Sequence, residues 1–295
     1  MRYLIINADG YGFTEGITRA IEKCVNFGTV KSISVNVNFP FVMALSQFVK
    51  IHPELSVGCH LNPVVGKPVL PVTKVPSLVN ETGEFFYKNF SKHFLLGKIN
   101  KKELRSELLA QIEKTRRLAG ETFSHIDFHM GLHRLPGLYP IFLDVVKLSG
   151  VGRIRTHRYL EGLESPSYKW RHLQYVFEKP ARPLKYLWNI LLRWKAKQIG
   201  LAMPDYWVGI SNMTTVPGKI SVEMYQKMIS HLPNGFSEFV VHPGYADQDL
   251  QKYSSYIQKR EEELNVLTDQ RLKDFLSKSD VRLSGYRDIP LCKKK

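Results

Sequence analysis

The sequence is poor in long apolar runs, in cysteine and in targeting signals. No stretch approaches the roughly 18 consecutive apolar residues of a membrane-spanning helix. The start does not resemble a secretory signal, because the apolar run at residues 3–6 is short and polar residues 7–9 follow it. Three widely spaced cysteines, Cys24, Cys59 and Cys292, form neither a disulfide framework nor a Cys-x-x-Cys metal site. We therefore expect a cytoplasmic protein with free thiols.

Positive charge is the unusual feature of the composition. The 295 residues carry a formal net charge of +15, whereas an apolar share of 43% and a charged share of 23% are ordinary for a globular enzyme. Residues 153–200 hold eleven Lys or Arg against three Glu, so eight of the fifteen net charges lie there. Such a surface attracts phosphates of nucleic acid, anionic lipid or nucleotide-linked substrates. A merely solvated cationic surface also stays open.

Short β-branched segments alternate with helical patterns along most of the chain. Strands are expected at residues 3–7, 32–38, 55–59, 125–128, 153–156, 238–241 and 281–283, and helices at 15–27, 41–51, 101–118, 138–149, 222–232 and about 261–277. Such strand–helix units imply a parallel sheet with helices outside, and closure into a barrel is its natural form. We therefore predict an α/β fold, a (β/α) barrel-like single domain over residues 1–295. Segments 66–87 and 160–179 are expected to be long loops over the site.

Polar residues follow the expected strands at the end where barrels place their chemistry. Asp9, His60, His129 and His242 occupy such positions, with His133 close behind His129. A single histidine or aspartate there is more often a hydrogen-bonding or turn residue. Together they match the imidazole and carboxylate ligands of a catalytic divalent metal with an open water position. The set favours metal-assisted hydrolysis of an amide or ester.

The same residues carry a resemblance to a known family. Residues 7–12, Asn-Ala-Asp-Gly-Tyr-Gly, resemble the Asn-Ala-Asp-Asp-Phe-Gly opening of the YdjC-like carbohydrate deacetylases. Further similar motifs follow in the family's order: Gly-Cys-His-Leu-Asn at 58–62, His-Ile-Asp-Phe-His at 125–129 with His133 after one spacing change, His-Pro-Gly-Tyr at 242–245, the Arg-x-x-Glu-Leu-x-x-Leu-Thr pattern at 260–268, and Tyr-Arg-Asp at 286–288. The resemblance spans nearly the whole chain.

The resemblance implies a distorted TIM-type barrel that deacetylates N-acetylated sugars with one divalent metal ion. It implies that His60 and His129 bind the metal, that Asp9 is the general base or a further ligand, and that His242 protonates the leaving amine. Other matching or neighbouring residues are expected to orient the ligands or contact the substrate: His125, Asp127, His133, Asn62 and Arg155. Imidazole ligands favour a zinc-like ion, and the family also suggests Mg²⁺.

One departure from the family pattern affects the metal site. Gly10 stands where the family has a second aspartate, an expected third ligand. Three alternatives stay open: Asp9 ligates while His133 or Asp127 acts as base, Asp127 fills the gap, or the chain is a degenerate, non-catalytic relative. We favour a rearranged site over a lost one. Gly10 also has a plain explanation as a turn residue with positive φ.

A basic amphipathic segment at about 157–200 is expected as an insertion in the domain. Leu184, Leu187, Trp188 and Leu191 fall at helical spacing behind Pro183, and Lys or Arg side chains surround them. The stripe packs on the core, or it forms an interfacial helix on anionic lipid. The second alternative assigns Trp188, Trp194, Lys185 and Arg193 to the membrane side and suits a glycolipid or lipid-linked sugar. No motif for reading nucleic acid is present.

The sequence therefore predicts a cytoplasmic deacetylase of acetamido sugars, with peripheral binding at the inner membrane surface and a homodimer left open. A non-catalytic sugar- or lipid-binding relative with a degraded metal site is the alternative. A metal-dependent hydrolase of another bond, such as a phosphoester, is a third.

Overall fold

Strands and helices alternate along the chain, as the sequence pattern predicted. The computed structural model describes residues 1–295 except 87–88, 210–218, 253–255 and 293–295. The strands are β1 (Arg2–Tyr11), β2 (Ser32–Val35), β3 (Ser56–Leu61), β4 (Phe123–Phe128), β5 (Tyr206–Gly209), β6 (Gly235–Val241) and β7 (Val281–Ser284). The helices are α1 (Glu15–Phe27), α2 (Leu45–Ile51), α3 (Phe90–Leu95), α4 (Lys101–Ala119), α5 (Leu138–Ser149), α6 (Tyr168–Phe177), α7 (Ala181–Gln198), α8 (Val222–Ser230), α9 (Gln248–Gln251), α10 (Gln258–Leu267) and α11 (Gln270–Lys278).

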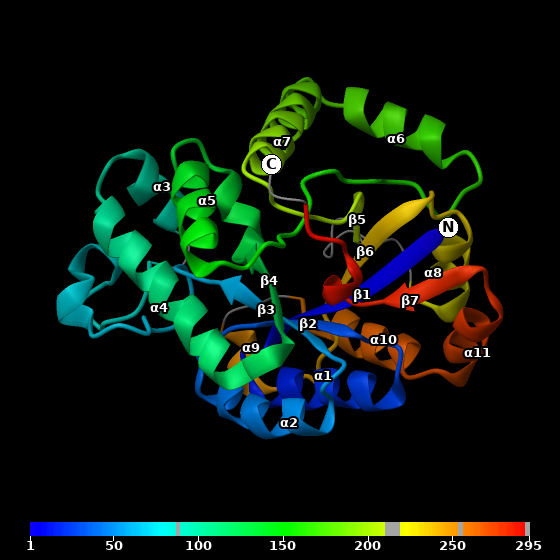
Figure 1. The fold of residues 1–295 in the computed structure, drawn as a ribbon, viewed down its shortest axis with the longest axis horizontal. Helices are drawn as coiled ribbons and strands as arrows, with labels where there is room; N and C mark the ends of the chain where they lie inside the picture. Colours follow the sequence, from blue (N-terminus) through cyan, green and yellow to red (C-terminus); the bar gives the residue numbers. More distant parts are fainter. Residues whose placement is uncertain (87–88, 210–218, 253–255, 293–295) are drawn as a thin grey trace.

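The strands form one parallel sheet that curls into a half-barrel (Figure 1). Their order is β4-β3-β2-β1-β6-β5, and β7 pairs with the first residues of β1. Residues 153–159 lie between the two edge strands as a seam. Isolated parallel bridges hold the seam, from Ile126 to Ile154, from Arg153 to Ala202 and from Tyr159 to Trp207. The (β/α) barrel prediction is confirmed in this distorted form. The expected strand at 153–156 is not a continuous strand, and its residues pair only through isolated bridges.

Local signals in the sequence set the ends of the principal helices. The Thr14 side chain accepts a hydrogen bond from the backbone N–H of Ile17 and so caps α1, which ends at Gly28 with φ +96°. The Asn100 side chain caps α4 in the same way. The predicted helix at 261–277 is two helices instead, because Asp269 starts α11 with its own cap. The predicted loop at 160–179 was wrong in part, since it contains α6.

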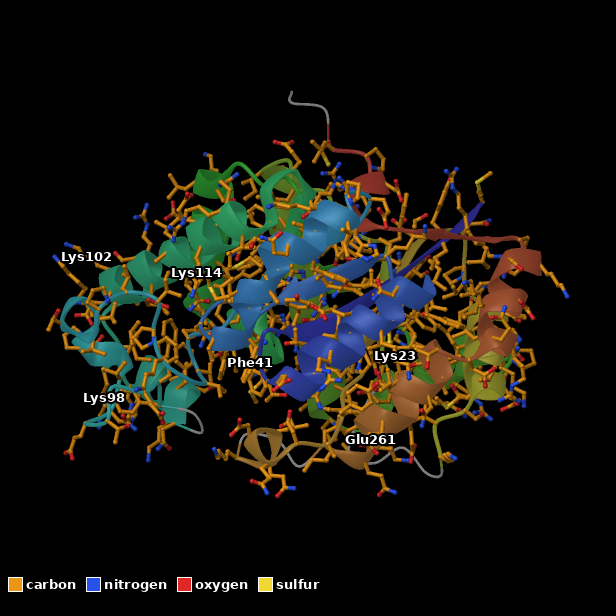
Figure 2. The ribbon with its side chains drawn as sticks, turned by 90° about the horizontal axis from the view of Figure 1, so that it is seen from below. Lys23, Phe41, Lys98, Lys102, Lys114 and Glu261 are labelled. Atoms are coloured by element: carbon orange, nitrogen blue, oxygen red, sulfur yellow. The ribbon has the colours of Figure 1, made fainter. Side chains whose placement is uncertain are left out.

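Helices cover both sides of the half-barrel. Residues 4–8 of β1 are fully buried, as expected for a central strand of a parallel sheet. The view from below in Figure 2 shows α1 and α10, with the charged residues Lys23 and Glu261 pointing outward. On the opposite side, α6 and α7 lie above the sheet (Figure 1). None of the described helices is long and apolar enough to cross a membrane.

Candidate active site

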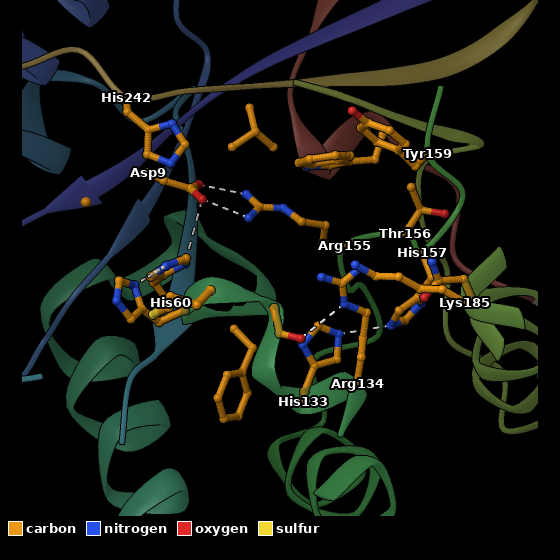
Figure 3. Close-up of a pocket in the computed structure, with 18 of the residues that line it drawn as sticks. Asp9, His60, His133, Arg134, Arg155, Thr156, His157, Tyr159, Lys185 and His242 are labelled. Carbon is orange, nitrogen blue, oxygen red and sulfur yellow. Dashed lines mark hydrogen bonds and ion pairs between the residues drawn. The ribbon is translucent and has the colours of Figure 1, made fainter. Parts of the chain in front are cut away.

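The predicted site residues meet at the carboxyl end of the sheet, around one cavity of about 680 Å³. Asp9 lies near the end of β1, His60 near the end of β3, and His129 directly after β4. His242 follows β6, and Figure 3 shows its ring beside Asp9. Because parallel strands end at the same edge of the sheet, residues far apart in sequence become neighbours here. The cavity is lined by all four of these side chains.

Arg155, from the seam, holds the carboxylates of the site together. Its Nη1 and Nη2 atoms donate to the two oxygens of Asp9 at 2.8 and 2.7 Å, a bidentate pair (Figure 3). Its Nη2 lies 2.8 Å from an Asp127 oxygen, and its Nε donates to Glu238 at 2.9 Å. Asn7 also donates to Asp9 at 2.7 Å. One guanidinium therefore contacts three buried carboxyl groups.

The charge states of these groups follow from burial and from Arg155. Burial by itself raises the pKa of Asp9 and of Asp127, but the charges of Arg155 and His60, together with the hydrogen bonds of each carboxylate, outweigh it and hold each pKa below its ordinary value. Burial dominates at Glu238 and raises its pKa to about 7. Asp9 and Asp127 are therefore ionised at neutral pH, whereas Glu238 exchanges its proton near neutrality.

Asp127 fixes the orientation of the His60 ring. The His60 Nδ1 atom lies 3.0 Å from an Asp127 oxygen, and the Ser34 hydroxyl donates to the other Asp127 oxygen at 3.1 Å. An ionised carboxylate only accepts hydrogen bonds, so His60 Nδ1 carries the proton of this pair. The Nε2 atom of His60 is then directed to His129 Nδ1, 3.2 Å away. Burial lowers the pKa of His60, but the charges of Asp127 and Asp9 raise it overall, so a metal ion at Nε2 would take the place of a proton there.

The site offers two candidate sets of metal ligands. Asp9, His60 and Asp127 offer atoms that lie within 4.8 Å of one another. Arg155 already contacts both carboxylates of that group, at 2.7 Å and 2.8 Å. On the other side of the imidazole, the 3.2 Å between His60 Nε2 and His129 Nδ1 is close to the spacing of two ligands on one tetrahedral ion. Two nitrogen atoms bound to one tetrahedral ion lie about 3.3 Å apart when each metal–nitrogen bond is about 2.0–2.1 Å long. The imidazole pair fits an ion better than the carboxylate group.

His242 is held through its backbone. Its backbone N–H donates to Glu263 at 2.6 Å, and Arg260 donates to its carbonyl at 3.3 Å. Its ring nitrogens make no hydrogen bond to the described part of the chain. Burial lowers the pKa of His242 to about 3 against the opposing charge of Asp9, so the ring is a neutral imidazole at pH 7. The Tyr256 hydroxyl donates a hydrogen bond of 2.6 Å to the other oxygen of Glu263.

Three further candidates from the sequence make hydrogen bonds or ring contacts with residues other than Asp9 and His242. His133 bonds to His157 at 2.9 Å between their Nε2 atoms, so it lines the cavity but is not placed to serve Asp9. Asn62 accepts from the backbone N–H groups of Val64 and Val65 and acts as a turn residue outside the cavity lining. His125 stacks on Tyr286 at 3.6 Å, beneath the site.

Gly10 lines the cavity, and its backbone explains why it is glycine. Its φ of +109° is a conformation that L side chains rarely adopt. A Cβ atom there would lie 3.4 Å from Ile17, so space alone does not forbid a side chain. The turn explanation for Gly10 therefore has direct support in the backbone.

The far end of the cavity is cationic. Arg134, Arg182 and Lys185 line it, together with His157 and His172. Arg182 pairs with the exposed Glu178, whereas Arg134 and Lys185 pair with no acidic residue in the described ranges. Sequence reasoning did not identify this end, nor Glu238. The one available signal for Glu238 was an acidic residue directly before the apolar run Phe239–Val241.

Of the four residues that the membrane alternative assigns to the lipid side, Trp188 and Arg193 make contacts within the protein. Trp188 is partly buried and donates through its indole N–H to the Arg134 carbonyl at 2.8 Å. Arg193 bonds to the Thr156 hydroxyl and the Pro204 carbonyl, and Lys185 lines the cavity. Trp194 is exposed. The reason is geometric, because Trp188 and Arg193 lie on the side of α7 that faces the protein.

The chain is similar to known proteins over nearly its whole length. A carbohydrate deacetylase of Geobacillus stearothermophilus is 28% identical over 289 residues, with 98% of each chain covered. One of Thermoanaerobacter pseudethanolicus is 27% identical over 286 residues, covering 97% of this chain and 98% of the relative. A solved structure of a cellobiose-phosphate cleavage protein from Enterococcus faecalis aligns with a TM-score of 0.70 at 26% identity, over 97% of both chains. The sequence model of the YdjC-like protein family matches residues 3–278, so this chain belongs to the YdjC-like family.

Proposed function

We propose that this protein removes the acetyl group from an N-acetylated sugar by hydrolysis, with one divalent metal ion bound by His60 and His129. The convergence of His60 Nε2 and His129 Nδ1, 3.2 Å apart beside Asp9 and His242, is the observation that carries the proposal. The carbohydrate deacetylases to which the chain is similar support the same reaction. A bound divalent ion supplies polarisation of the acetyl carbonyl and a lowered pKa of water.

We assign both proton transfers of the reaction to the ring of His242. Asp9 is clamped by Arg155, which weakens it as a base, so its expected role as general base is not the one that we assign. Asp127 is occupied by His60 and Ser34, and His133 by His157. The neutral His242 ring is free to take the proton from the attacking water, and the Asp9 carboxylate beside it stabilises the imidazolium that forms. His242 then gives this proton to the amine nitrogen as the C–N bond breaks.

The cationic end of the cavity suggests an anionic group on the substrate. Arg134 and Lys185 both line the cavity without an acidic partner among the described residues. Burial lowers the pKa of Arg134 and of Lys185, and the charge of Arg134 also lowers the pKa of Lys185. An anion placed between the two side chains would therefore stabilise the charged form of both. Arg side chains bind phosphate in a bidentate manner. We therefore propose an acetamido sugar that carries phosphate, in keeping with the cellobiose-phosphate named for the E. faecalis protein.

Acetate release tests the proposal. Purified protein, loaded with Zn²⁺ or Mg²⁺, is incubated with N-acetylated mono- and oligosaccharides and with their phosphate esters. Acetate should appear, faster from the phosphate esters. His60→Ala and His129→Ala should lose both bound metal and acetate release, whereas His93→Ala, away from the cavity, should keep both. Metal binding without acetate from any sugar would refute deacetylation, and a metal-free, inert protein would favour the non-catalytic alternative.

A further inference from the structure

The outer sides of α6 and α7 expose an unusual number of large apolar side chains. We call this surface the α6–α7 face and define it by Trp170, Leu173, Phe177, Leu184, Leu187, Ile190, Leu191 and Trp194. These side chains are between 38% and 71% exposed. Soluble proteins rarely expose a contiguous apolar surface of this kind unless it binds something.

Helical spacing gathers these residues on one side of each helix. In α6, the exposed apolar positions 170, 173 and 177 follow the i, i+3, i+7 pattern. In α7, positions 184, 187, 191 and 194 do the same. The two helices pack on each other and lie farthest from the sheet on that side (Figure 1). The apolar stripes of both helices are thus exposed to solvent. The alternative that the α7 stripe packs on the core does not hold for Leu184, Leu187 and Leu191.

The inner sides of the same helices serve the cavity and the core. Tyr175 and Val176 of α6 and Tyr186 and Asn189 of α7 line the cavity. Leu192 of α7 is fully buried. The two helices are therefore anchored without using their outer apolar side, which remains available to a partner.

Positive charge surrounds the α6–α7 face. Lys169, Lys179, Lys195 and Lys197 are exposed on or beside these helices and form no ion pair with a described residue. The local acidic residues Glu164 and Glu178 are already paired, with Arg171 and Arg182. The opposite side of the molecule differs, since it presents mixed charges such as Lys23 and Glu261 (Figure 2).

We propose that the α6–α7 face docks on the surface of an anionic phospholipid bilayer. Apolar stripes with Trp and Phe, flanked by Lys, are the composition of helices that lie in a membrane interface. The unpaired lysines attract anionic headgroups while the apolar side chains enter the acyl boundary. A second copy of the chain fits less well, because two surfaces rich in lysine would repel each other. Docking would leave α6 and α7, whose inner sides line the cavity, between the cavity and the headgroups.

Vesicle sedimentation tests the docking. The full-length protein is mixed with vesicles of phosphatidylcholine alone or of phosphatidylcholine with phosphatidylglycerol, at low and at physiological salt. Binding should require phosphatidylglycerol and should weaken as salt rises. The double variant Leu187→Gln/Trp194→Gln should bind at least about tenfold more weakly, because two apolar anchors are lost.

A matched control variant distinguishes vesicle binding by the α6–α7 face from nonspecific binding by any exposed apolar side chain. Leu95 and Leu96, next to each other at the end of α3, are 60% and 61% exposed and lie outside the α6–α7 face. The double variant Leu95→Gln/Leu96→Gln should bind vesicles like the wild type. Circular dichroism and an unchanged Tm check that both variants are folded.

Three outcomes would overturn the proposal. The first is an absence of binding to anionic vesicles at low salt. The second is equal loss of binding in the α3 control variant. The third is a dimer in analytical ultracentrifugation that Leu187→Gln/Trp194→Gln dissociates, which would assign the face to a second copy of the chain. None of these outcomes bears on deacetylation, so the two proposals fail separately.

Discussion

Replacing Arg155 with glutamine should be among the most damaging single changes in this protein. The guanidinium makes the bidentate pair with Asp9 and contacts both Asp127 and Glu238. Glutamine keeps a polar side chain but removes the charge, so two ionised carboxylates are left in the interior. Acetate release should be lost as well, since Asp9 keeps its hydrogen bond from Asn7 but loses the bidentate pair that fixes both of its oxygens beside His242.

The magnitude follows from the partners that remain. Removing one partner of a buried ion pair costs about 3–5 kcal/mol. The effects on three carboxyl groups do not add, because Glu238, with a pKa of about 7, can take up a proton and His60 still contacts Asp127. We therefore expect a total loss of about 3–5 kcal/mol, which corresponds to a fall in Tm of about 6–20 °C for a chain of this size.

The loss should also depend on pH in a defined direction. Arg155 holds the pKa of Asp9 and of Asp127 below the ordinary value, so its stabilisation is complete above about pH 4 and is lost as pH falls through the folded-state pKa values. The difference between wild type and Arg155→Gln should therefore be largest at neutral pH and shrink in acid.

Thermal unfolding followed by circular dichroism at several pH values measures this difference. Arg105→Gln is the control, because Arg105 pairs with Asp144 at the surface, where both side chains are more than 40% exposed. It should cost no more than about 1 kcal/mol. If Arg155→Gln is as stable as Arg105→Gln, the three carboxyl groups do not depend on Arg155 and the electrostatic account of the site is wrong.

Three further predictions concern single residues of the site. Glu238→Gln should make the free energy of unfolding, measured in urea, depend less on pH. Burial raises the pKa of Glu238 to about 7, so the free energy of unfolding of the wild type should fall by about 3 kcal/mol through this group as pH rises from about 4.5 to 7. An unchanged slope would contradict this. His242→Gln should abolish acetate release but leave bound metal stoichiometric by elemental analysis; loss of metal would make His242 a ligand instead. Gly10→Asp should lower stability by about 1–2 kcal/mol because of its positive φ, without tightening metal binding in calorimetry; a sharp gain in affinity would show that the site lacks a ligand.

The sequence predicted the parts of the fold that local signals determine. The bounds of α1 and α5 were predicted to the residue, because apolar periodicity and a following glycine define both helices. The meeting of Asp9, His60, His129 and His242 was predictable since parallel strands end at one edge of the sheet. These features need only the order of elements along the chain.

Features that depend on long-range packing were not predictable. Arg155 was expected to orient the ligands or contact the substrate, but its bidentate pair with Asp9, 146 residues away in the sequence, was not predicted. The predicted strand at 153–156 pairs only through isolated bridges, and nothing in its pattern indicates which carboxylate lies beside it. The α7 stripe shows apolar spacing, but nothing in that spacing says which way the stripe faces. His133 matched a family position, yet its partner is His157, and that pair depends on where the seam runs.

The seam also gives the site a mechanical connection to the surface. The α6–α7 pair is inserted in the seam, between the bridge at Tyr159 and the bridge at Ala202. The chain therefore runs from residues 153–159, where Arg155 contacts Asp9, directly into α6, and it returns from α7 to the bridge at Ala202. Hydrogen bonds from Trp188 to the Arg134 carbonyl and from Arg193 to the Thr156 hydroxyl add to this connection. The helices that expose the outward apolar side chains are thus tied, at both ends and along their inner side, to the segment whose arginine pairs with Asp9.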